Sequence, residues 1–526
     1  MPHAVVASPP GRARRVVSTA LALLVSAVGV AGCDRTVQPT EVLPALQPGS
    51  VDADAGSWRM LVLGGPEQFQ VPAPAAVTSD LYRAELAAVK AAQARMTGAQ
   101  RRALDYWSGG GVLRWNQLLR ELVARYNLPP APRPDGSYAA PDAENPFADP
   151  QFPFANPPYA ARAYSYVSVA QYEALKAAWH WKFRYGRPSP ARVDPDVQAL
   201  VPTGDLPAYP SEDAVLAGVT AEMLKLLFPA SVDEITRRAA EQREAALLSG
   251  KATASDVAAG LALGRAVAAV VIARARADGM GAAGGTPAEW QALADDARAR
   301  GEIAWVSLET PARPPMLPNF GRVQPWTMSA AEAVGLEPGP PPSTSSTRMQ
   351  EEVAEVRHAV EGLTRAQLAI ALRWNDGAGT YTPPGHWNDI AAEYVRDARM
   401  SEVRAARVFA LLNAAMHDAA VGCWAVKFRY FNPRPSQLDP SIRTTIGLPN
   451  FPSYPSGHST FSAAAAEVLG YFFPAHAAEL AAMADEAGIS RLYGGIHYRS
   501  DIEQGKAHGQ RIGAHVVRFA RADRAE

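Results

Sequence analysis

The feature that most restricts how this chain can fold is a series of short motifs that occurs twice, at a constant separation of 245 residues. Lys-Phe-Arg-Tyr stands at 182–185 and again at 427–430, and Tyr-Pro-Ser stands at 209–211 and at 454–456. Phe-Pro (228–229, 473–474) and Ser-Asp (255–256, 500–501) repeat in the same order, and Trp-Asn (115–116, 387–388) repeats with a shifted offset. Matches in one order and one register predict two related structural units.

Both units consist mainly of long segments rich in Ala, Leu, Val, Glu and Arg. Their apolar residues recur at the three-to-four spacing of an amphipathic helix, and runs with the alternating, β-branched pattern of strands are scarce. The predicted fold class is therefore all-α, with two related helical bundles that arise from an internal duplication. Helices are expected at 81–96, 213–227, 255–277, 351–374, 402–424 and 459–472.

The composition limits the possible partners. Hydrophobic residues make up 48% of the chain and charged residues 20%, which is typical of a globular protein. The net charge of -1 creates no overall field for a polyanion, so nucleic acid is not predicted as a partner. After Cys33 the only cysteine is Cys423, which excludes an intrachain disulfide in the folded part, and its apolar neighbours indicate a buried side chain.

The N-terminus has the pattern of an export signal. Arginines at 12, 14 and 15 precede an apolar run at 16–30, which is followed by Ala31-Gly32-Cys33. Small residues directly before a cysteine resemble the bacterial lipobox, which predicts that Cys33 is lipidated after cleavage. An ordinary secretory signal and an uncleaved anchor are the alternatives. All three predict export, and the lipobox predicts a lipid-anchored protein of the bacterial cell envelope on its periplasmic or extracellular face.

The second unit contains residues suited to holding a tetrahedral oxyanion. Two guanidinium groups and one ammonium group can neutralise such an anion, the former through paired donors. Ser456 and Gly457 precede a predicted helix, whose N-terminal backbone N–H groups favour anions, and glycine lets the backbone approach a ligand closely. The charged and ionisable candidates are Lys427, Arg434, His458, Arg491, His497 and Asp501.

Two of these residues are spaced for nucleophilic chemistry. His497 and Asp501 are four residues apart, so on one helix they share a face, and the carboxylate can hold the imidazole in one tautomer while the other nitrogen attacks. His497 is therefore the predicted nucleophile. His458 comes from a different segment and is the predicted proton donor. His386 is a weaker candidate for the same cleft.

The first unit departs from this pattern. It retains Lys182 and Arg187, but its other counterparts cannot bind an anion or attack one. The first bundle is therefore predicted to be structural, with Lys182 and Arg187 paired to the acids Glu212 and Asp213. The replacements are Glu212 for Gly457, Asp213 for His458, Ala246 for Arg491 and Ala252 for His497.

The motifs at 427–501 resemble the three-part signature of the superfamily of vanadium-dependent haloperoxidases and type 2 phosphatidic acid phosphatases. The resemblance is strong over residues 374–518 and weaker over 81–330. The signature is specific for the pocket but is shared by both branches of the superfamily, so it does not by itself select the reaction.

The resemblance implies a role for each matching residue. In the haloperoxidase branch His497 coordinates vanadate, His458 assists peroxide binding and protonation, and halide is oxidised to hypohalous acid. In the phosphatase branch His497 attacks phosphorus to form a phosphohistidine, His458 protonates the leaving alcohol, and no cofactor is required. In both branches the oxyanion oxygens are held by Lys427, Arg434, Ser456, Gly457 and Arg491.

Two features favour the haloperoxidase branch. The duplicated layout is similar to the soluble haloperoxidases, and Trp424 with Phe451 resembles the aromatic pair of a chloroperoxidase pocket, although both rings could also be plain core residues. The predicted function is vanadate-dependent oxidation of halide by hydrogen peroxide. The alternatives are an acid phosphatase acting on phosphomonoesters or lipid phosphates and a non-catalytic oxyanion-binding lipoprotein. The expected partners are small molecules, either peroxide and halide or phosphate esters, and a membrane through the lipid anchor.

These inferences divide the chain into five parts. The signal peptide is expected at 1–32, a tether at 33–75 and a degenerate N-terminal bundle at 76–309. A Pro-rich connector at 310–345 then leads to the catalytic bundle at 346–526.

Overall fold

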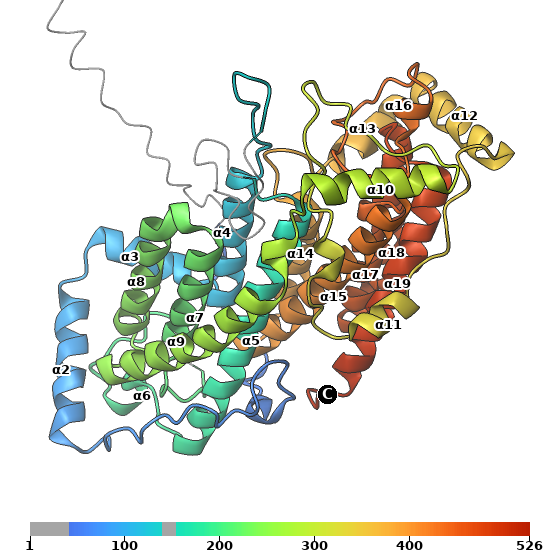
Figure 1. Ribbon diagram of the computed structural model, residues 1–526. Coiled ribbons are helices and arrows are strands. Elements are labelled where there is room, and N and C mark those ends of the chain that lie inside the picture. The colour runs from blue at the N-terminus through green and yellow to red at the C-terminus, as the bar shows by residue number, and fades with distance from the viewer. Residues whose placement is uncertain (1–41, 139–153, 203) are drawn as a thin grey trace, which may run out of the picture. The chain divides into compact units, whose positions relative to one another are not determined.

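The computed structural model describes residues 42–138, 154–202 and 204–526, which fold into helices and irregular connections (Figure 1). Across these ranges no β-strand forms, and a single isolated bridge joins Asn127 to Phe154. The predicted all-α fold class is therefore confirmed. The predicted signal peptide and the lipidation site Cys33 lie outside the described residues.

The helices of the first half surround one long helix, α5. The α-helices are α2 (Asp80–Ala94), α3 (Gly98–Ser108), α4 (Gly111–Tyr126), α5 (Pro157–Tyr185), α6 (Pro190–Val193), α7 (Glu212–Leu227), α8 (Val232–Leu248), α9 (Ala254–Ala277) and α10 (Pro287–Ala299). The 3-10 turns of this half are η1 (Ala55–Ser57), η2 (Pro229–Ser231) and η3 (Met280–Ala282).

The second half is built around a corresponding long helix, α15. Its α-helices are α11 (Ala330–Gly335), α12 (Thr347–Glu361), α13 (Arg365–Arg373), α14 (Thr382–Asp397), α15 (Glu402–Tyr430), α16 (Pro435–Leu438), α17 (Gly457–Phe472), α18 (Ala477–Tyr493) and α19 (Arg499–Arg521). The 3-10 turns are η4 (Phe320–Arg322) and η5 (Pro474–His476).

The helices α5 to α9 recur as α15 to α19 at nearly the same separation as the sequence motifs. Helices α5 and α15 are both 29 residues long. Helices α7 and α17 both follow a serine N-cap, Ser211 and Ser456, whose side chain accepts a backbone N–H of the first turn. This correspondence supports the interpretation that the chain contains two related bundles.

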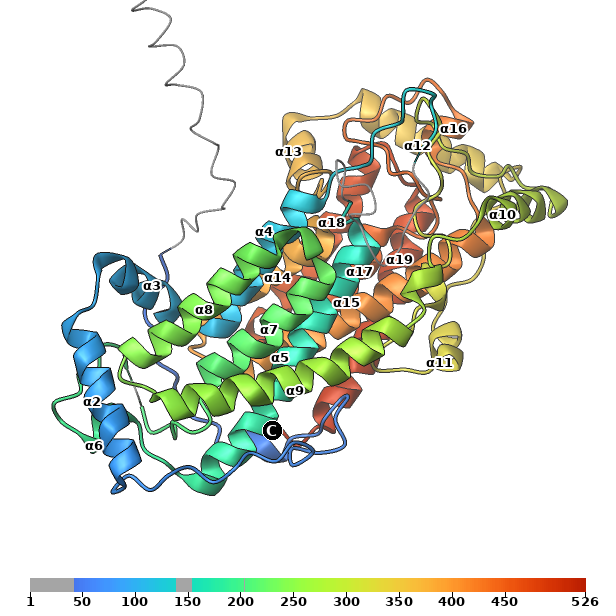
Figure 2. The ribbon, with the colours of Figure 1, turned by 60° about the vertical axis from the view of Figure 1, so that its left-hand side comes forward.

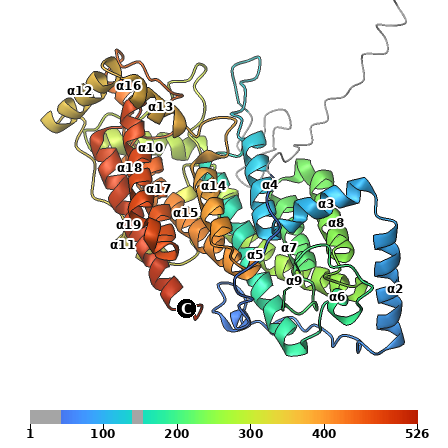
Figure 3. The same cartoon turned by 180° about the vertical axis from the view of Figure 1, so that it is seen from behind.

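The two bundles pack against each other through their central helices. Figures 1 and 3 show α7 to α9 on one side of the α5–α15 pair and α17 to α19 on the other, and Figure 2 shows α5 and α15 side by side. Buried amides cross this interface: Asn116 donates to Asn388 at 2.7 Å, and Asn413 donates to Ser168 at 2.8 Å. Because these polar groups are satisfied, the interface is specific as well as apolar.

A short irregular segment crosses each central helix in the same way. Trp179 of α5 donates its indole N–H to Val51 O at 2.8 Å, and Trp424, at the same position of α15, donates to Met316 O at 3.1 Å. We call residues 51–63 the first strap and residues 316–328 the second strap. Each strap therefore begins at an indole of the helix that it crosses.

A buried carboxylate then fixes each strap to its helix. Glu173 of α5 accepts the backbone N–H groups of residues 61–63 at 2.8 to 3.0 Å. Asp418, 245 residues later in α15, accepts those of Trp326 and Thr327 at 2.7 and 3.1 Å. The straps therefore belong to the repeated unit, although their sequences show no obvious similarity.

The strap contacts correct the prediction for residues 33–75. From residue 42 onward this segment is not a free tether, because Trp58, Leu63 and Val71 are buried against the helices. Its Pro, Gly and Asp content resembles that of a linker, but the few apolar residues anchor it. The predicted connector at 310–345 likewise contains the second strap and α11 and packs on α15.

The helix predicted at 351–374 is two helices. Helix α12 ends at Glu361, and α13 begins at Arg365 after Thr364, which forms a capping box with Gln367. Gly362 between them disfavours helix continuation, and the Thr-x-x-Gln pattern starts a new helix. The sequence contained this break signal within an otherwise continuous apolar period.

Two helical stretches among the described residues are long and apolar enough to cross a membrane, Ala254–Ala282 and Glu402–Leu438. The apolar window of the second stretch is 94% buried inside the protein, because it contains the central helix α15. Its hydrophobicity is therefore explained by its place in the core.

One buried histidine of the core has no hydrogen-bond partner among the described residues. His508 of α19 is fully buried and faces α15 where Gly422 leaves room, since a Cβ there would lie 2.9 Å from the imidazole Cε1. Burial, followed by the charge of Arg511, lowers the pKa of His508 to about 3. The ring is therefore neutral in the folded protein.

We expect His508 to make the fold sensitive to acid. In the unfolded chain this side chain titrates near pH 6.5, so below that pH the unfolded chain binds a proton that the folded chain does not. The free energy of unfolding is unaffected by His508 above pH 6.5, and below it this residue reduces that free energy by about 1.4 kcal/mol for each pH unit toward pH 3. When the free energy of unfolding is measured in urea between pH 7 and 5, its dependence on pH should be smaller in His508→Leu, because the variant takes up one proton fewer on unfolding. If the pH dependence of the unfolding free energy in His508→Leu were the same as in the surface control His476→Leu, the role assigned to His508 would be wrong.

Candidate active site

The structure brings the predicted charged and ionisable residues into one cluster in the second bundle. His497 is almost fully buried; the charges of Arg434, Lys427, Arg491 and His458 act on it, and Asp501 contacts it directly. The six residues come from five helices and their ends: Lys427 lies near the end of α15, Arg434 at the N-cap of α16, His458 in the first turn of α17, Arg491 in the last turn of α18, His497 directly before the N-cap of α19, and Asp501 in the first turn of α19.

Asp501 holds His497, but not in the way predicted. His497 precedes α19, which begins at Arg499, so the two residues do not share a helix. The capping turn nevertheless places Nδ1 of His497 2.8 Å from Oδ2 of Asp501. The same oxygen also accepts the backbone N–H of Tyr498 at 3.2 Å and the hydroxyl of Ser453. This arrangement puts the proton on Nδ1 and leaves the lone pair on Nε2.

Burial and the surrounding cations keep the imidazole of His497 neutral. Burial, then the charges of Arg434, Lys427 and Arg491, lower the pKa of His497 well below its ordinary value. Nη1 of Arg434 donates to Nε2 at 3.1 Å, so the unprotonated nitrogen points toward the cationic part of the site. A neutral imidazole with an unprotonated Nε2 can ligate a metal-oxo anion or attack phosphorus once a ligand takes the place of this contact.

Three buried cations beside His497 form no ion pair with an acid anywhere in the described ranges. Lys427, Arg434 and Arg491 are at most 1% exposed. Their donors reach backbone carbonyls instead, for example Ser453 O at 2.7 Å from Lys427 and Ile496 O at 2.8 Å from Arg434. Burial lowers the pKa of Arg434 and of Arg491 to about 10, and also lowers that of Lys427. Buried charges without a counter-ion are unfavourable, so the cluster is suited to an anion.

The equivalent cations of the first half are neutralised internally. Lys182 pairs with Glu212 at 2.7 Å, as predicted, and Lys251 contacts both Glu212 and Asp213 at 2.8 Å. A cavity of about 260 Å³ is lined by these acids and by Lys251. The first half therefore carries acids in ion-pair contact with its cations, whereas Lys427, Arg434 and Arg491 of the second half have no such contact among the described residues.

The predicted partner of Arg187 was wrong. Arg187 contacts Asp256, the counterpart of Asp501, at 2.6 Å rather than Glu212 or Asp213. Ala252 stands at the position of His497, so no imidazole competes for this carboxylate. The same aspartate therefore holds an arginine in one half and the predicted nucleophile in the other.

A cavity of about 400 Å³ opens onto the second cluster. Lys427, Arg434, Ser456 and Asp501 are not part of its wall and lie behind it. The predicted residues that line it are Trp424, Phe451, Gly457, His458, Arg491 and His497. Residues outside the second bundle complete the wall, including Asn127, Phe154 and Pro157 of the first half and Arg313 and Met316 near the second strap.

The N-terminus of α17 offers fewer backbone donors than expected. The N–H of Ser456 donates to Asp501 O at 2.9 Å, and the Ser456 hydroxyl accepts the N–H of Ser459 at 3.3 Å. Of the two donors of Ser456, only the hydroxyl hydrogen therefore remains available to a ligand. The N–H of Gly457 has no acceptor in the described part of the chain, and it begins the helix, where an anion is stabilised.

The aromatic pair predicted from sequence lies against the cations. The ring centroids of Trp424 and Phe451 are 5.0 Å apart, and both rings line the cavity. The Phe451 ring lies 5.1 Å from Nζ of Lys427 and 5.0 Å from the guanidinium carbon of Arg434. The pair therefore forms an apolar wall that separates the buried charges from the open part of the cavity.

Sequence reasoning missed Asp376, which contacts the predicted proton donor. Nε2 of His458 lies 3.6 Å from Oδ2 of Asp376 and has no hydrogen-bond partner among the described residues. Burial, then the charge of Arg491, lowers the pKa of His458 to about 4. Asp376 adopts a left-handed backbone at φ 46°, and Asp376-Gly377 is a turn signal that could have drawn attention to it.

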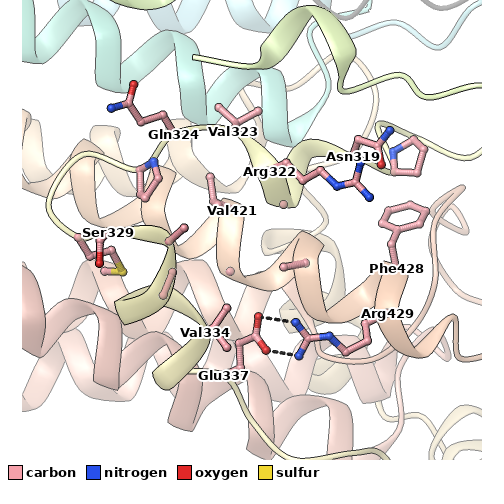
Figure 4. A pocket seen from close by; sticks show the side chains of 18 of the residues that line it. Asn319, Arg322, Val323, Gln324, Ser329, Val334, Glu337, Val421, Phe428 and Arg429 are labelled. Atoms are coloured by element: carbon pink, nitrogen blue, oxygen red, sulfur yellow. Dashed lines mark hydrogen bonds and ion pairs between the residues drawn. The ribbon is translucent and has the colours of Figure 1, made fainter. Parts of the chain in front are cut away.

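A larger cavity, of about 610 Å³, lies on another face of α15 (Figure 4). It is lined by Val421 and Phe428 of α15 and by the segment from Pro318 to Glu337. Its main polar feature is the ion pair between Arg429 and Glu337, which Figure 4 shows at one end. It contains none of the predicted site residues, so size alone does not identify the active site.

The model of the PAP2 superfamily matches residues 407–524 of the chain. The matched segment contains every predicted residue from Lys427 to Asp501, and the predicted superfamily resemblance is confirmed.

Two relatives resemble parts of the chain. Vanadium chloroperoxidase of Curvularia inaequalis is 33% identical over 139 residues, which cover 20% of this chain and 23% of that protein. A non-specific acid phosphatase of Salmonella typhi is 42% identical over 69 residues, which cover 13% of this chain and 25% of that protein. The chain thus matches about a quarter of the length of each relative.

Two solved structures share the fold. A structure described as the first bacterial vanadium-dependent iodoperoxidase has a TM-score of 0.55 and 23% identity, and covers 77% of this chain and 94% of its own. A holo-type bacterial vanadium-dependent chloroperoxidase has a TM-score of 0.50 and 14% identity, and covers 73% of this chain and 97% of its own. The similarity extends over both halves of the chain and concerns the fold.

Proposed function

We propose that this protein is an enzyme that binds vanadate at His497 and oxidises halide with hydrogen peroxide. The observation that carries the proposal is the cluster of Lys427, Arg434 and Arg491, buried beside a neutral imidazole without acidic partners. In the first half of the same protein, by contrast, Lys182 and Arg187 are paired with the acids Glu212 and Asp256. An anion that supplies the counter-charge would stabilise a buried site with this charge.

The residues present fit vanadate. Nε2 of His497 is unprotonated and accepts only from Nη1 of Arg434, Nη2 of Arg434 is buried without a partner in the described residues, and the N–H of Gly457 at the helix N-terminus has no acceptor there. Bound vanadate would supply Lewis-acid activation of peroxide. A nitrogen ligand together with anion-binding donors is the set that such an oxyanion requires.

The side chains around the oxyanion divide the remaining work. Asp501 fixes the orientation and tautomer of His497, and the cations hold the oxygens. Because the pKa of His458 is lowered to about 4, this imidazole is neutral near pH 7 and can take up the proton of an incoming peroxide, then return it to the departing oxygen. The wall of Trp424 and Phe451 limits the entry of water.

The fold similarity to peroxidases over both halves supports this reaction, since the paired-bundle layout is shared along 77% of the chain. The second candidate is a phosphatase, favoured by the 42% identity to the acid phosphatase segment. In that reaction Nε2 of His497 attacks phosphorus, the alcohol leaves with a proton from His458, and water then cleaves the phosphohistidine.

One preparation can distinguish the two reactions. We expect the purified protein, stripped of bound oxyanion, to oxidise bromide or iodide with peroxide only after vanadate is added, while His497→Ala stays at background. Ester hydrolysis should be slow and inhibited by vanadate. Brisk ester hydrolysis without halide oxidation would instead establish the phosphatase, and absence of both would overturn the proposal.

A further inference from the structure

Asp376 lies between two imidazoles, of which only one faces the cavity. Oδ1 and Oδ2 of Asp376 lie 3.1 and 3.3 Å from Nδ1 of His386, and Oδ2 lies 3.6 Å from Nε2 of His458. Asp376 and His458 line the cavity, whereas His386 does not. The order from the cavity outward is therefore His458, Asp376, His386.

His386 is held rigidly on its outer side. Its ring stacks on Trp374 with centroids 4.4 Å apart and an interplanar angle of 26°. Trp374 is itself anchored, because its indole N–H donates to Glu486 at 2.8 Å and its carbonyl accepts from Arg491. The His386 side chain is 14% exposed, so the outer end of the array lies close to solvent.

The carboxylate of Asp376 depends on His386 for its orientation. In the part of the chain that the structure describes, Nδ1 of His386 is its only donor within hydrogen-bond distance, since 3.6 Å to His458 is too long for a direct bond. The two imidazoles lower the pKa of Asp376 to about 2 against the opposing effect of burial, so it is ionised.

We propose that His386 is a positioning residue that holds the Asp376 carboxylate at His458 and so orients the imidazole that transfers the proton. The inference rests on the proposed function only in assigning a proton transfer to His458, and both candidate reactions need that transfer. The charged groups that act on His458 are Arg491, Asp376, His386 and His497, while Asp376 and Tyr381 contact His386. His386 does not line the cavity.

The test compares two replacements of His386. His386→Phe keeps a ring against Trp374 but removes the donor, whereas the amide of His386→Asn can donate from nearly the place of Nδ1. We expect kcat to fall about tenfold in the Phe variant with KM within about twofold, and to recover to within about threefold in the Asn variant. The limb of the pH profile that belongs to His458 should move to lower pH in the Phe variant, because losing the oriented Asp376 carboxylate, which raises the pKa of His458, outweighs losing the His386 charge, which lowers it.

The matched control is His476→Phe. His476 also contacts a carboxylate, Glu479 at 3.3 Å, and an aromatic ring, Tyr394 at 4.8 Å, but is exposed and far from the cavity wall. It should leave kcat and the pH profile unchanged. A uniform loss of activity in both His386 variants with an unchanged pH profile would show that His386 is merely structural and would overturn the proposal.

A spectroscopic measurement separates this inference from the proposed function. In protein with 15N-labelled histidine, the titration of His458, assigned with His458→Gln, should shift to lower pH in His386→Phe and return in His386→Asn. This readout needs no substrate, so it decides the role of His386 even if neither halide oxidation nor ester hydrolysis is found. An identical titration in wild type and His386→Phe would overturn the inference.

Discussion

His497→Ala should abolish turnover, whichever of the two reactions the protein catalyses. The change removes Nε2, the atom that would ligate vanadate or attack phosphorus, and no other histidine of the cluster has a nitrogen held in that orientation by a buried carboxylate. Loss of the attacking or ligating group costs at least about 10³-fold in kcat. The loss of kcat is measured in steady-state assays, one with peroxide and halide and one with a phosphate ester.

The fold should tolerate this change. The first half already carries Ala252 at the equivalent position, where the surrounding helices keep the same layout. Asp501 retains the hydroxyl of Ser453 and the N–H of Tyr498 as donors, so its carboxylate is not left without partners. We expect the free energy of unfolding to change by no more than about 1 to 2 kcal/mol.

The control is His515→Ala, which removes a half-buried histidine of α19 away from the cavity. It should keep full turnover. If His497→Ala were to retain turnover while folded, the oxyanion could not be attached at this imidazole, and the assignment of the site would have to be abandoned.

The sequence indicated which residues come together in the inner cluster because they lie in or beside repeated or closely spaced motifs. Lys427 belongs to the repeated Lys-Phe-Arg-Tyr motif, Arg434 and His458 lie a few residues after repeated motifs, and His497 with Asp501 has a spacing that brings two side chains together. The pairing depends on a capping turn rather than on one helix face, yet the contact is the same. Short-range spacing therefore located the contact without fixing the local geometry.

The outer part of the site could not be predicted in this way. Asp376 belongs to the connection between α13 and α14, and Phe154 and Pro157 belong to the other bundle. Phe154 and Pro157 reach the cavity because α5 packs on α15, a contact between residues far apart in the chain. Spacing along the sequence carries no information about such contacts, and for Asp376 the only local signal is the Asp376-Gly377 turn pattern.

Composition misled the prediction for the straps. Residues 42–75 and 310–345 are rich in Pro and Gly, which is typical of linkers. What holds the straps is their backbone, through N–H groups accepted by Glu173 and Asp418, and backbone donors are invisible in a sequence. The two acids are 245 residues apart, so the repeat contained a signal for the straps that becomes recognisable only with the structure.

Gly457→Glu should abolish oxyanion binding and leave the protein folded. In the first half Glu212 occupies this position at the start of α7, and its carboxylate reaches Lys182 at 2.7 Å. Lys182 is the counterpart of Lys427, and α7 and α17 begin in the same way after a serine N-cap. The new carboxylate should therefore neutralise Lys427 and occupy the space of the oxyanion.

The second half has room for the new side chain. A Cβ at Gly457 would meet nothing closer than the Phe461 ring at 3.7 Å, which is ordinary van der Waals contact. An internal carboxylate beside unpaired cations removes the charge imbalance, so the thermal midpoint of the unliganded protein should stay unchanged or rise. Electrostatic competition at such a short distance should weaken vanadate or phosphate binding by at least about 100-fold.

Matched variants separate charge from size. Gly457→Gln places a side chain of the same length without the charge, and Gly457→Ala tests the loss of glycine alone. We expect a ranking of affinity from wild type through Ala and Gln to Glu, measured as the rise in thermal midpoint with added vanadate, which follows the ratio of ligand concentration to Kd. Because the first half already contains the Glu arrangement, equal binding by the Gln and Glu variants would mean that the cations of the second half do not hold the oxyanion.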